Sequence, residues 1–578
     1  MEYPTLNVKQ KSRQMSDAFL GYNHNLRIGD SEFYDMKNMT SDYYPVLAPR
    51  KKRGVYKDGI KANGIIAKDK LCYVDGSAFV IGDERIEMGL SDSTKELISM
   101  GAYVIIMPDR KYINTITTSD RGDIDEVHET TEDVTFTLCT LTGEAYENPT
   151  VSDTAPANPT NEQLWIDTSS TPHTLKKYSS ANAMWVSIAT TYIKVSSRGI
   201  GTNLKQYDGV KISGIQGDLE SLNSSHALWG CADDYIIITG ILDKVTTQTE
   251  SITVSRKMPT LDFIVESKNR LWGCRYGTNE DGDTVNEIYA CKLGDFKNWN
   301  CFMNLSTDSY KVSCGTDGQF TGAITHLGYP LFFKENCVHK VYGDYPSNFQ
   351  LQDTACRGVQ RGSHRSLAIV NETLLYKSGN GVCAYDGSLP VEMSSALGEI
   401  RYSDAVAGAH GNKYYIDMKD AGGVYHLFVY DTAKDMWHKE DTDFHVDGFC
   451  SYMNEMYGID HDKKHIITML GSGTQDGKRV PWMVESGLIG MSMPDMKYIS
   501  RLMVRMSLEV GADVAVSIQY DSMGDWEPVC MMTSTSLRTF SVPVRPRRCD
   551  HFRIRIEGEG ECRIYSITRT IEQGSDIS

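Results

Sequence analysis

Short apolar runs of four to eight residues recur along most of the chain, separated by turns rich in Gly, Asn and Asp. Helical periodicity, with apolar residues three and four positions apart, is scarce. Apolar runs of this length between turn residues are typical of β-strands. The pattern therefore predicts an all-β protein.

Many of these runs fall into one recurring unit: a strand, a tight polar turn, and a second strand that ends in an aromatic residue or a Gly-Asp turn. Examples start at Ile65, Leu261, Ile324, Leu367, Ala405 and Cys450. From Ile324 onward the starts lie roughly 40 to 45 residues apart, the spacing of four-stranded propeller blades. One blade cannot bury both of its faces alone, so neighbouring blades stack. We expect a β-propeller of about six or seven blades.

The recurrence breaks between about Asp120 and Ser225. An acidic stretch leads into sequence rich in Pro, Asn and Thr, followed by the aromatic segment from Asn161 to Trp185. Long insertions into a loop between strands cost little conformational entropy. We interpret residues 126–225 as a small β module inserted into the propeller, with a long blade loop as the alternative.

The last part of the chain has a different pattern. Arg501–Met506, Val514–Tyr520 and His551–Ile556 alternate between apolar and polar residues with period two. Such strands have one buried face and one solvent-exposed face, as in an antiparallel sandwich. The expected domains are an N-terminal docking segment (1–58), the propeller (59–125 and 226–485), the inserted module (126–225) and a C-terminal β-sandwich (486–578).

The composition of the chain argues against several classes of function. The 578-residue chain has a formal net charge of −17, which argues against a protein that grips DNA through its phosphates. It has no apolar run near twenty residues, so no membrane insertion is expected, and its start lacks the layout of a signal peptide. The 14 cysteines show no C-x-x-C spacing. In a protein folded in a cytoplasm they are interpreted as reduced, buried thiols, in preference to a zinc site or a disulfide network.

Three segments carry a resemblance to one class of protein. Gly21–Gly54 resembles the opening of the tail nozzle or tail hub proteins of short-tailed bacteriophages, also called tail tubular protein B or packaged-DNA stabilisation protein. In that family an Asn-rich stretch leads to a Pro and to a turn rich in Arg and Lys. The residues that fill this pattern here are Asn38, Tyr44, Pro45 and Arg50.

The other two segments are similar to parts of phage tail proteins. Around Trp165, Asp167 and Trp185 the insert looks like a small module that recurs in tail and tail-fibre proteins. The C-terminal segment from Arg545 to Ile567 is similar to the sandwich ends of phage tail structural proteins.

The resemblance implies a structural component of the virion tail, assembled in the host cytoplasm. Copies of the chain, commonly six, form a nozzle or hub ring that extends the tail channel, helps retain packaged DNA and forms its exit path. The implied partners are other copies, portal and adaptor proteins, tail fibres or spikes, and passing viral DNA without sequence-specific contact.

Candidate contact residues follow from the same resemblance. Gly21–Gly54, with Asn38, Tyr44, Pro45 and Arg50, is the candidate for docking to the adaptor or to a neighbouring subunit. Trp165, Asp167 and Trp185 are candidates for an outward contact with fibres. The main basic cluster, which includes Arg545, Arg547 and Arg548, lacks an aromatic stacking platform, so we interpret it as a solvated or inter-subunit face in preference to a nucleic-acid site.

No metal or cofactor is expected. The loop Asn279–Glu287 offers oxygen ligands at alternating positions but lacks EF-hand spacing, and its Asp-Gly fits a hairpin turn. His461 and His465 are four residues apart, but the spacing falls in a β turn, with no third ligand in view.

The sequence predicts that the chain is not an enzyme, because it has no nucleophile elbow, P-loop, HExxH motif or dinucleotide fingerprint. Two alternatives stay open. One is a receptor- or glycan-binding tail protein, in which the Trp165 module and the propeller face host sugars. The other is a propeller glycosidase, for which the only approximate Asp-box turn runs from Asp521 to Trp526.

Overall fold

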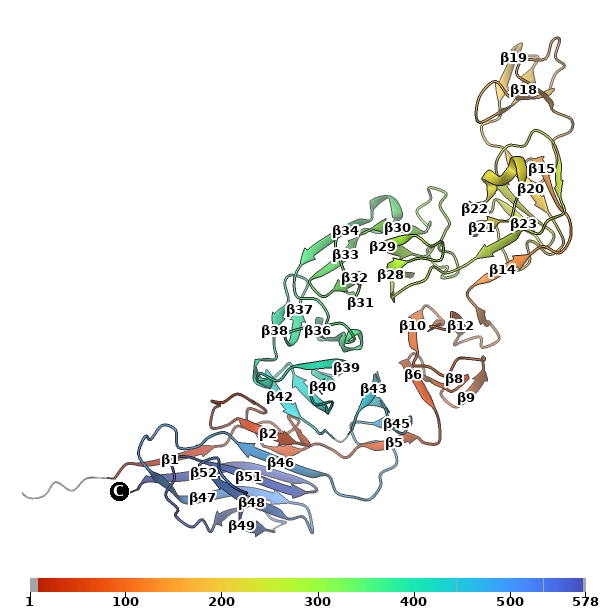
Figure 1. Ribbon diagram of the computed structural model, residues 1–578. Coiled ribbons are helices and arrows are strands. Elements are labelled where there is room, and N and C mark those ends of the chain that lie inside the picture. Colours follow the sequence, from red (N-terminus) through yellow and green to blue (C-terminus); the bar gives the residue numbers. More distant parts are fainter. Residues whose placement is uncertain (1–8, 443, 534, 575–578) are drawn as a thin grey trace, which may run out of the picture. The chain divides into compact units, whose positions relative to one another are not determined.

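The computed structural model describes residues 9–442, 444–533 and 535–574. Within these ranges the regular elements are β-strands and four short 3-10 helices, so the prediction of an all-β protein is confirmed (Figure 1). None of the described helices is long and apolar enough to cross a membrane. The chain divides into two compact units: residues 1–97, 333–338 and 354–578 form the first, and residues 98–332 and 339–353 form the second.

The first unit contains four four-stranded antiparallel sheets that follow one another in space. Their strands are β35 (Ala368–Val370), β36 (Thr373–Lys377), β37 (Val382–Tyr385) and β38 (Val391–Glu392); β39 (Tyr402–His410), β40 (Lys413–Asp420), β41 (Tyr425–Asp431) and β42 (Met436–Lys439); β43 (Val446–Tyr452), β44 (Glu455–Asp460) and β45 (Ile466–Thr468) with β5 (Gly54–Lys57); and β6 (Ala62–Ala67), β7 (Leu71–Asp75), β8 (Ala78–Ile81) and β9 (Glu84–Glu87). Helices η3 (His364–Ser366) and η4 (Ser395–Leu397) flank the first of them.

Apolar side chains fill the spaces between neighbouring sheets of this unit. Tyr415 and Leu427 of one sheet pack with Met456 of the next. Ile466 of that sheet packs in turn with Tyr73 of the sheet β6–β9. Each sheet is therefore buried on faces that it cannot cover alone.

Two further antiparallel sheets in the first unit share one hydrophobic core. One has the order β1-β52-β47-β50 and the other β2-β46-β51-β48-β49, and a two-stranded sheet, β3-β4, lies beside them. Their strands are β1 (Lys11–Ser16), β2 (Phe33–Lys37), β3 (Met39–Thr40), β4 (Ala48–Pro49), β46 (Pro481–Ser486), β47 (Lys497–Leu508), β48 (Val514–Tyr520), β49 (Glu527–Met532), β50 (Arg538–Val542), β51 (Phe552–Glu559) and β52 (Cys562–Gln573).

The period-two pattern seen in the sequence is the alternation of buried and wet side chains on these strands. Leu502 and Val504 of β47, Val516 and Ile518 of β48, and Phe552 of β51 are fully buried in the shared core. Arg505 is exposed and Gln519 and Arg553 are partly exposed, whereas Ser517 is buried. The prediction of strands with one wet face is confirmed for β47, β48 and β51.

The second unit contains three four-stranded sheets and the inserted module. The sheets are β10 (Glu96–Met100), β11 (Tyr103–Met107), β12 (Lys111–Asn114) and β13 (Arg121–Asp123); β27 (Phe263–Ser267), β28 (Arg270–Thr278), β29 (Thr284–Ala290) and β30 (Tyr310–Ser313); and β31 (Gly322–His326), β32 (Tyr329–Lys334), β33 (Cys337–Tyr342) and β34 (Gln350–Ala355), with η2 (Pro346–Asn348) before β34. Ile105 packs with Leu271 between the first two sheets, and Ile288 packs with Phe332 between the second and the third.

The inserted module has three sheets of its own, in the orders β14-β26-β21-β22, β23-β24-β20-β15-β25 and β16-β17-β18-β19. Its elements are β14 (Glu126–Glu129), β15 (Val134–Cys139), β16 (Thr150–Ser152), β17 (Leu164–Asp167), β18 (Thr174–Ser179), β19 (Met184–Ser187), β20 (Tyr192–Ser196), β21 (Gly209–Ser213), η1 (Gly217–Leu222), β22 (Ser225–Ala227), β23 (Gly230–Ala232), β24 (Tyr235–Thr239), β25 (Thr246–Gln248) and β26 (Thr253–Arg256). Phe136, Ile193 and Val254 bury their side chains in its common core.

The observed boundaries differ from the expected ones in two places. The module extends to β26 at Arg256, beyond the expected end at 225, because β25 and β26 return to pair with β15 and β14. The described part of the expected N-terminal segment, residues 9–58, supplies strands to sheets that later parts of the chain form. Strands β1 and β2 complete the C-terminal sheets, and β5 pairs with β45. In Figure 1 the red N-terminal strands β1 and β2 lie against the blue C-terminal ones.

None of the 14 cysteines forms a disulfide bond in the described structure, and ten of them are buried. Cys274 lies inside β28, as its apolar neighbours in the sequence indicate. The prediction that the cysteines are mostly buried is confirmed.

Replacing Phe552 by Ala should destabilise the C-terminal sheets, because it removes a fully buried ring from their common core. Buried Phe to Ala changes cost about 3–5 kcal/mol. Hydrogen exchange of the β48 and β51 amides measures this loss locally. The control is Val510→Ala, whose side chain is 80% exposed. Equal protection in the two variants would contradict the shared core.

Candidate functional site

The segment that carries the family resemblance runs along the C-terminal sheets of the first unit. Strand β2 pairs with β46 from Phe33 opposite Ser486 to Lys37 opposite Met483. Leu47 forms a backbone bridge with Ile564. The segment is thus held by backbone hydrogen bonds over much of its length.

A buried ion-pair network fixes the end of this segment. Arg53 donates to Asp441 Oδ2 at 2.8 Å and to Glu440 Oε2 at 2.7 Å. Arg50 lies 3.4 Å from each of the same two carboxylate oxygens. All four side chains are at least 87% buried. Buried charges of this kind are stable only when each one is paired.

The two guanidinium groups are not equivalent. Burial and repulsion from Arg53 lower the pKa of Arg50 to about 10, because its contacts with the carboxylates are long. Burial alone would also lower the pKa of Arg53, but the closer Asp441 and Glu440 raise it overall. Arg53, which was not among the sequence candidates, is therefore the better-paired cation of the network.

The four docking candidates fall into two groups. Asn38 is buried, and its side chain accepts from Arg50 Nε and donates to the carbonyl of Pro481, both at 2.8 Å. Asn38 and Arg50 thus use their side chains within the subunit. Tyr44, which is 42% exposed, and Pro45 are the members of the set that another protein could contact.

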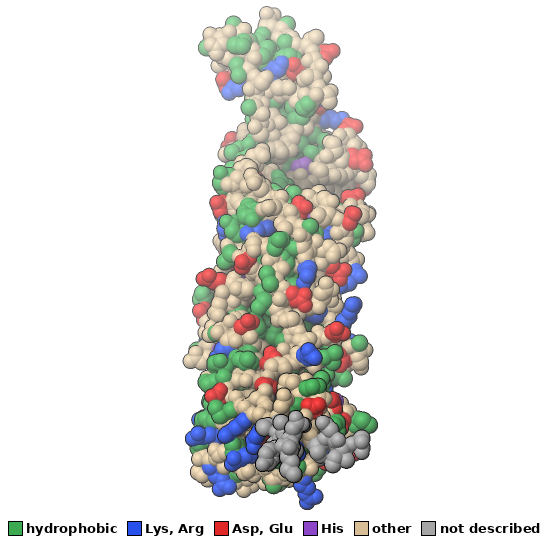
Figure 2. Space-filling model, turned by 90° about the vertical axis from the view of Figure 1, so that its left-hand side faces the viewer, with side chains coloured by type: hydrophobic (Ala, Val, Ile, Leu, Met, Phe, Trp, Pro, Cys, Tyr) green, Lys and Arg blue, Asp and Glu red, His purple; other side chains and the backbone are tan. Residues whose placement is uncertain are grey.

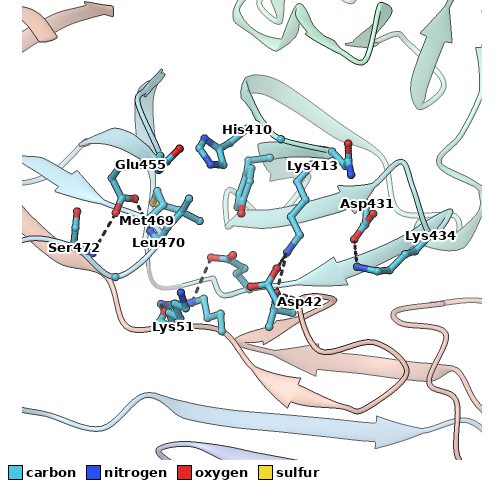
Figure 3. A pocket seen from close by; sticks show the side chains of 18 residues that line it. Asp42, Lys51, His410, Lys413, Asp431, Lys434, Glu455, Met469, Leu470 and Ser472 are labelled. Carbon is cyan, nitrogen blue, oxygen red and sulfur yellow. Dashed lines mark hydrogen bonds and ion pairs between the residues drawn. The ribbon is translucent and has the colours of Figure 1, made fainter. Parts of the chain in front are cut away.

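A polar cavity of about 660 Å3 opens next to this network, between the N-terminal segment and the sheets β39–β42 and β43–β45 (Figure 3). Several of its charged side chains form ion pairs with one another. Lys413 donates to Asp42 at 2.6 Å, and Lys434 donates to Asp431 at 3.0 Å. Glu455 accepts the backbone N–H of Leu470 at 2.7 Å. The cavity suits a small polar group, with cations and anions on its wall in similar number.

The ion pairs determine the protonation state of the carboxylates that line this cavity. Burial would raise the pKa of Asp42, but Lys413 lowers it below its usual value. Burial would likewise raise the pKa of Asp431, and Ser41 and Lys434 lower it. Both carboxylates are ionised at neutral pH, so neither can supply the proton of a general acid. His438, lying behind them, is neutral because complete burial and nearby Lys413 lower its pKa to about 3.

The residues proposed for an outward contact lie on the sheet β16–β19 of the insert. The rings of Trp165 and Trp185 meet edge to face with centroids 5.2 Å apart, and Tyr178 meets Trp185 at 5.3 Å. Trp165 is buried, whereas Trp185 is partly exposed on the edge strand β19. Asp167 is buried and accepts from Lys176 at 2.7 Å and from Ser169 at 2.6 Å. Only Trp185 of the three presents a partly accessible side chain for an external contact.

The predicted basic cluster is partly neutralised. Arg547 forms an ion pair with Glu527 and lies 4.8 Å from the ring centroid of Tyr520. Arg545 is exposed, and Arg548 lies beside Gly574. All three arginines are exposed, and Arg547 shares its charge with Glu527.

A different basic face lies on the outer side of the sheet β1-β52-β47-β50. Arg13 and Arg501 flank Thr570 from opposite sides, and Arg505 lies opposite Ser566. All three arginines are exposed, and none forms an ion pair with a described residue. Figure 2 shows Lys and Arg side chains gathered over these C-terminal sheets. The alternation in Arg501–Met506 places Arg501 and Arg505 on the wet face, but no sequence signal adds Arg13.

The other sequence candidates are local turns. Asn279 Oδ1 accepts the N–H groups of Asp281 and Asp283 at the tip of the hairpin β28–β29. Asp521–Trp526 connects β48 to β49. His461 does not face His465. Instead its ring lies 4.5 Å from that of His445, centroid to centroid.

Comparison with known proteins gives matches among solved structures. No family model and no curated protein matches the chain. Among solved structures, an exo-β-1,3-galactanase from Phanerochaete chrysosporium is 8% identical, over 53% of this chain and 94% of that chain, with a TM-score of 0.21. An acylaminoacyl peptidase from Pyrococcus horikoshii is 10% identical, over 54% of this chain and 55% of that chain, with a TM-score of 0.24. A sialidase from Trypanosoma rangeli is 9% identical, over 90% of this chain and 96% of that chain, with a TM-score of 0.18.

These neighbours carry the names of enzymes, and they contradict the expectation that the chain is not an enzyme, which we therefore withdraw. That expectation rested on missing linear motifs, and glycosidases bring their carboxylates together from distant segments. At these identities and TM-scores, the likeness assigns neither a reaction nor a substrate to this chain.

Replacing Arg53 by Met should lower the free energy of unfolding by about 3–5 kcal/mol, because it leaves two buried carboxylates with only the longer contacts of Arg50. Urea denaturation followed by circular dichroism measures the loss. The control is Lys51→Met, an exposed neighbour in the same segment. A change below about 1 kcal/mol, the range of surface pairs, would show that the network adds little.

Proposed function

We propose that the chain is a structural component of a bacteriophage tail. In this proposal it assembles with further copies into a nozzle or hub ring that extends the tail channel, helps retain packaged DNA and forms its exit path. The residues that resemble tail nozzle proteins motivate it. The observation that carries it is the uncovered basic face of Arg13, Arg501 and Arg505 on an acidic chain.

The proposal includes a β-propeller and a β-sandwich. The described residues contain seven four-stranded sheets outside the insert and the C-terminal pair. Within each unit, successive sheets bury apolar side chains against each other. Strand β5 joins β43–β45 from far away in the sequence, which is how a ring of blades can close without a covalent bond. The two C-terminal sheets with their common core support the sandwich.

The basic face fits contact with acidic protein surfaces. Neighbouring strands lie about 4.8 Å apart, so Arg13 and Arg501, on either side of β52, lie about 10 Å apart. Like charges this close repel each other unless anions neutralise them. The chain carries 76 acidic against 59 basic residues, so a neighbouring copy offers the complementary charge. Exposed Met15, in the row next to Arg13, adds apolar area to the same face.

Charge reversal of this face should prevent assembly. We expect the purified chain, alone or with tail components, to form closed rings with a central opening wide enough for duplex DNA. The triple variant Arg13→Glu, Arg501→Glu, Arg505→Glu should stay monomeric, because the face then repels its acidic neighbour. Electron microscopy with mass measurement distinguishes the two.

The matched control reverses three exposed cations of the first unit, Lys57, Lys61 and Arg85. It carries the same change in net charge and should still form rings. If wild-type chains never form rings, even in the presence of tail components, the proposal is wrong. Rings from the triple variant would remove the basic face from it, and salt-sensitive binding of duplex DNA to this face would assign it to nucleic acid instead.

A second candidate is glycan or receptor binding through the insert. The observation that favours it is the aromatic edge of β19, where partly exposed Trp185 is backed by Trp165 and Tyr178, with Met184 and Val186 exposed beside it. Aromatic rings supply large contact area with few rotatable bonds, and Trp is enriched at binding hot spots.

Trp185→Ala should weaken binding of the chain to immobilised bacterial surface polysaccharides by at least about tenfold, the loss typical of a central Trp. Surface plasmon resonance measures it. Trp229→Ala is the control, because Trp229 is also partly buried and meets two tyrosines, Tyr192 and Tyr207, elsewhere in the insert. Equal binding by both variants would argue against the β19 edge.

A further inference from the structure

Two imidazoles and one carboxylate converge beside the sheet that β5 completes. His445 precedes β43, Asp447 lies in β43, and His461 lies in the turn between β44 and β45. Their ligand atoms all lie within 4.8 Å of one another. The backbone N–H of His461 donates to the carbonyl of His445 at 3.0 Å, so strand pairing fixes the two residues opposite each other.

Asp417 orients one of the imidazoles. It lies on β40 and is fully buried. Its Oδ2 accepts from His445 Nδ1 at 2.6 Å and from the N–H of Val446 at 3.0 Å, whereas its buried Oδ1 has no hydrogen-bond partner. Because a carboxylate has no proton to donate, His445 carries its proton on Nδ1. Its Nε2 then faces Asp447 Oδ1, 4.0 Å away.

The ring of His445 is also held from one side. Tyr425 stacks on it with centroids 3.5 Å apart and planes 20° apart. The hydrogen bond from Nδ1 to Asp417 and the stacked ring of Tyr425 together fix the orientation of the imidazole, and with it the direction of the Nε2 lone pair. Histidines that bind metals are oriented by a carboxylate in this way, with the free nitrogen directed to the ion.

The distances suit a tetrahedral ion. With metal–ligand distances of 2.0–2.1 Å, neighbouring ligand atoms of a tetrahedral site lie about 3.3 Å apart. Asp447 Oδ1 is 2.7 Å from His461 Nδ1 and 4.0 Å from His445 Nε2, one distance below this value and one above it. Binding requires Asp447 Oδ1 to approach His445 Nε2 by about 0.7 Å and to lie about 0.6 Å farther from His461 Nδ1. A rotation of the Asp447 carboxylate makes the first change, and the side chain of His461, which is 49% exposed, has room to make the second.

We propose that His445, Asp447 and His461 form a binding site for one divalent transition-metal ion of the zinc type, with water as the fourth ligand. Two imidazoles and a carboxylate are ligands that zinc takes in sites with an open position. His461 Nδ1 gives its proton to solvent as the ion binds. Asp447 coordinates through Oδ1 and keeps its ion pair with Lys464 through Oδ2. The ion links the start of β43 to the turn after β44. The site departs from the expectation of no metal.

The experiment uses the full-length chain, treated with chelator and titrated with Co2+. Cobalt in a tetrahedral nitrogen and oxygen site absorbs visible light without the thiolate charge-transfer band that cysteine ligands produce. We expect one equivalent to bind with this spectrum. Binding through any of the 14 cysteines would add the thiolate band and would overturn the assignment.

Variants identify the ligands. His461→Ala should weaken Co2+ binding at least as much as loss of an outer-shell partner, about 10–100-fold. Because His461 is half exposed, the variant should keep the wild-type melting curve without metal. His410→Ala is the control, since His410 is partly exposed and its side chain hydrogen-bonds Ser451. Lys464→Gln should tighten binding several-fold, because it removes a positive charge beside the ion.

Binding that is unchanged in His461→Ala would overturn the proposal, and so would absence of binding to the wild-type chain. Zinc must also raise the melting temperature of the wild-type chain and of His410→Ala, because the ion binds only the folded sheet. An equal rise in His461→Ala would place the ion elsewhere and would likewise overturn the site.

Discussion

Pairing between strands from opposite ends of the sequence is the constraint on which the first unit depends. A sheet edge exposes unpaired N–H and C=O groups that must be covered or paired. Strand β1 covers one edge of β52, β2 covers one edge of β46, and β5 covers β45. The network of Arg50 and Arg53 with Glu440 and Asp441 then fixes the chain between β4 and β5. Without the N-terminal segment, three sheets of this unit would each lack an outer strand.

Local patterns in the sequence predict the strands well and their partners poorly. Alternation around Arg501, Val514 and Phe552 identifies the strands and their buried faces, because each strand's faces are set by its own residues. Nothing within β1 or β5 indicates a partner several hundred residues away. The same limit applies to Asn38 and Arg50, which look like surface residues until Glu440 and Pro481 are placed beside them.

The candidate sites show the same division. The four-residue spacing of His461 and His465 made them the candidate ligand pair in the sequence. In the structure, strand pairing instead places His445 beside His461. Arg545, Arg547 and Arg548 are close in sequence, and the sequence does not indicate that Arg547 pairs with Glu527. The face of Arg13, Arg501 and Arg505 exists only through the register of β52 with both of its neighbours. The sequence shows which residue types the chain contains, but the register between paired strands determines which of their side chains lie side by side.

The order of folding gives this register a consequence for assembly. Sheets such as β6–β9 and β39–β42 form from strands that are neighbours in sequence, so they can fold while the chain is being synthesised. The sheet β1-β52-β47-β50 cannot form until residues near 570 have been made, because β52 is its central partner. Arg13 joins Arg501 and Arg505 only at that point. If this face mediates contact with other copies, as proposed, a partly synthesised chain presents no complete face, and assembly is restricted to subunits whose sheets are closed.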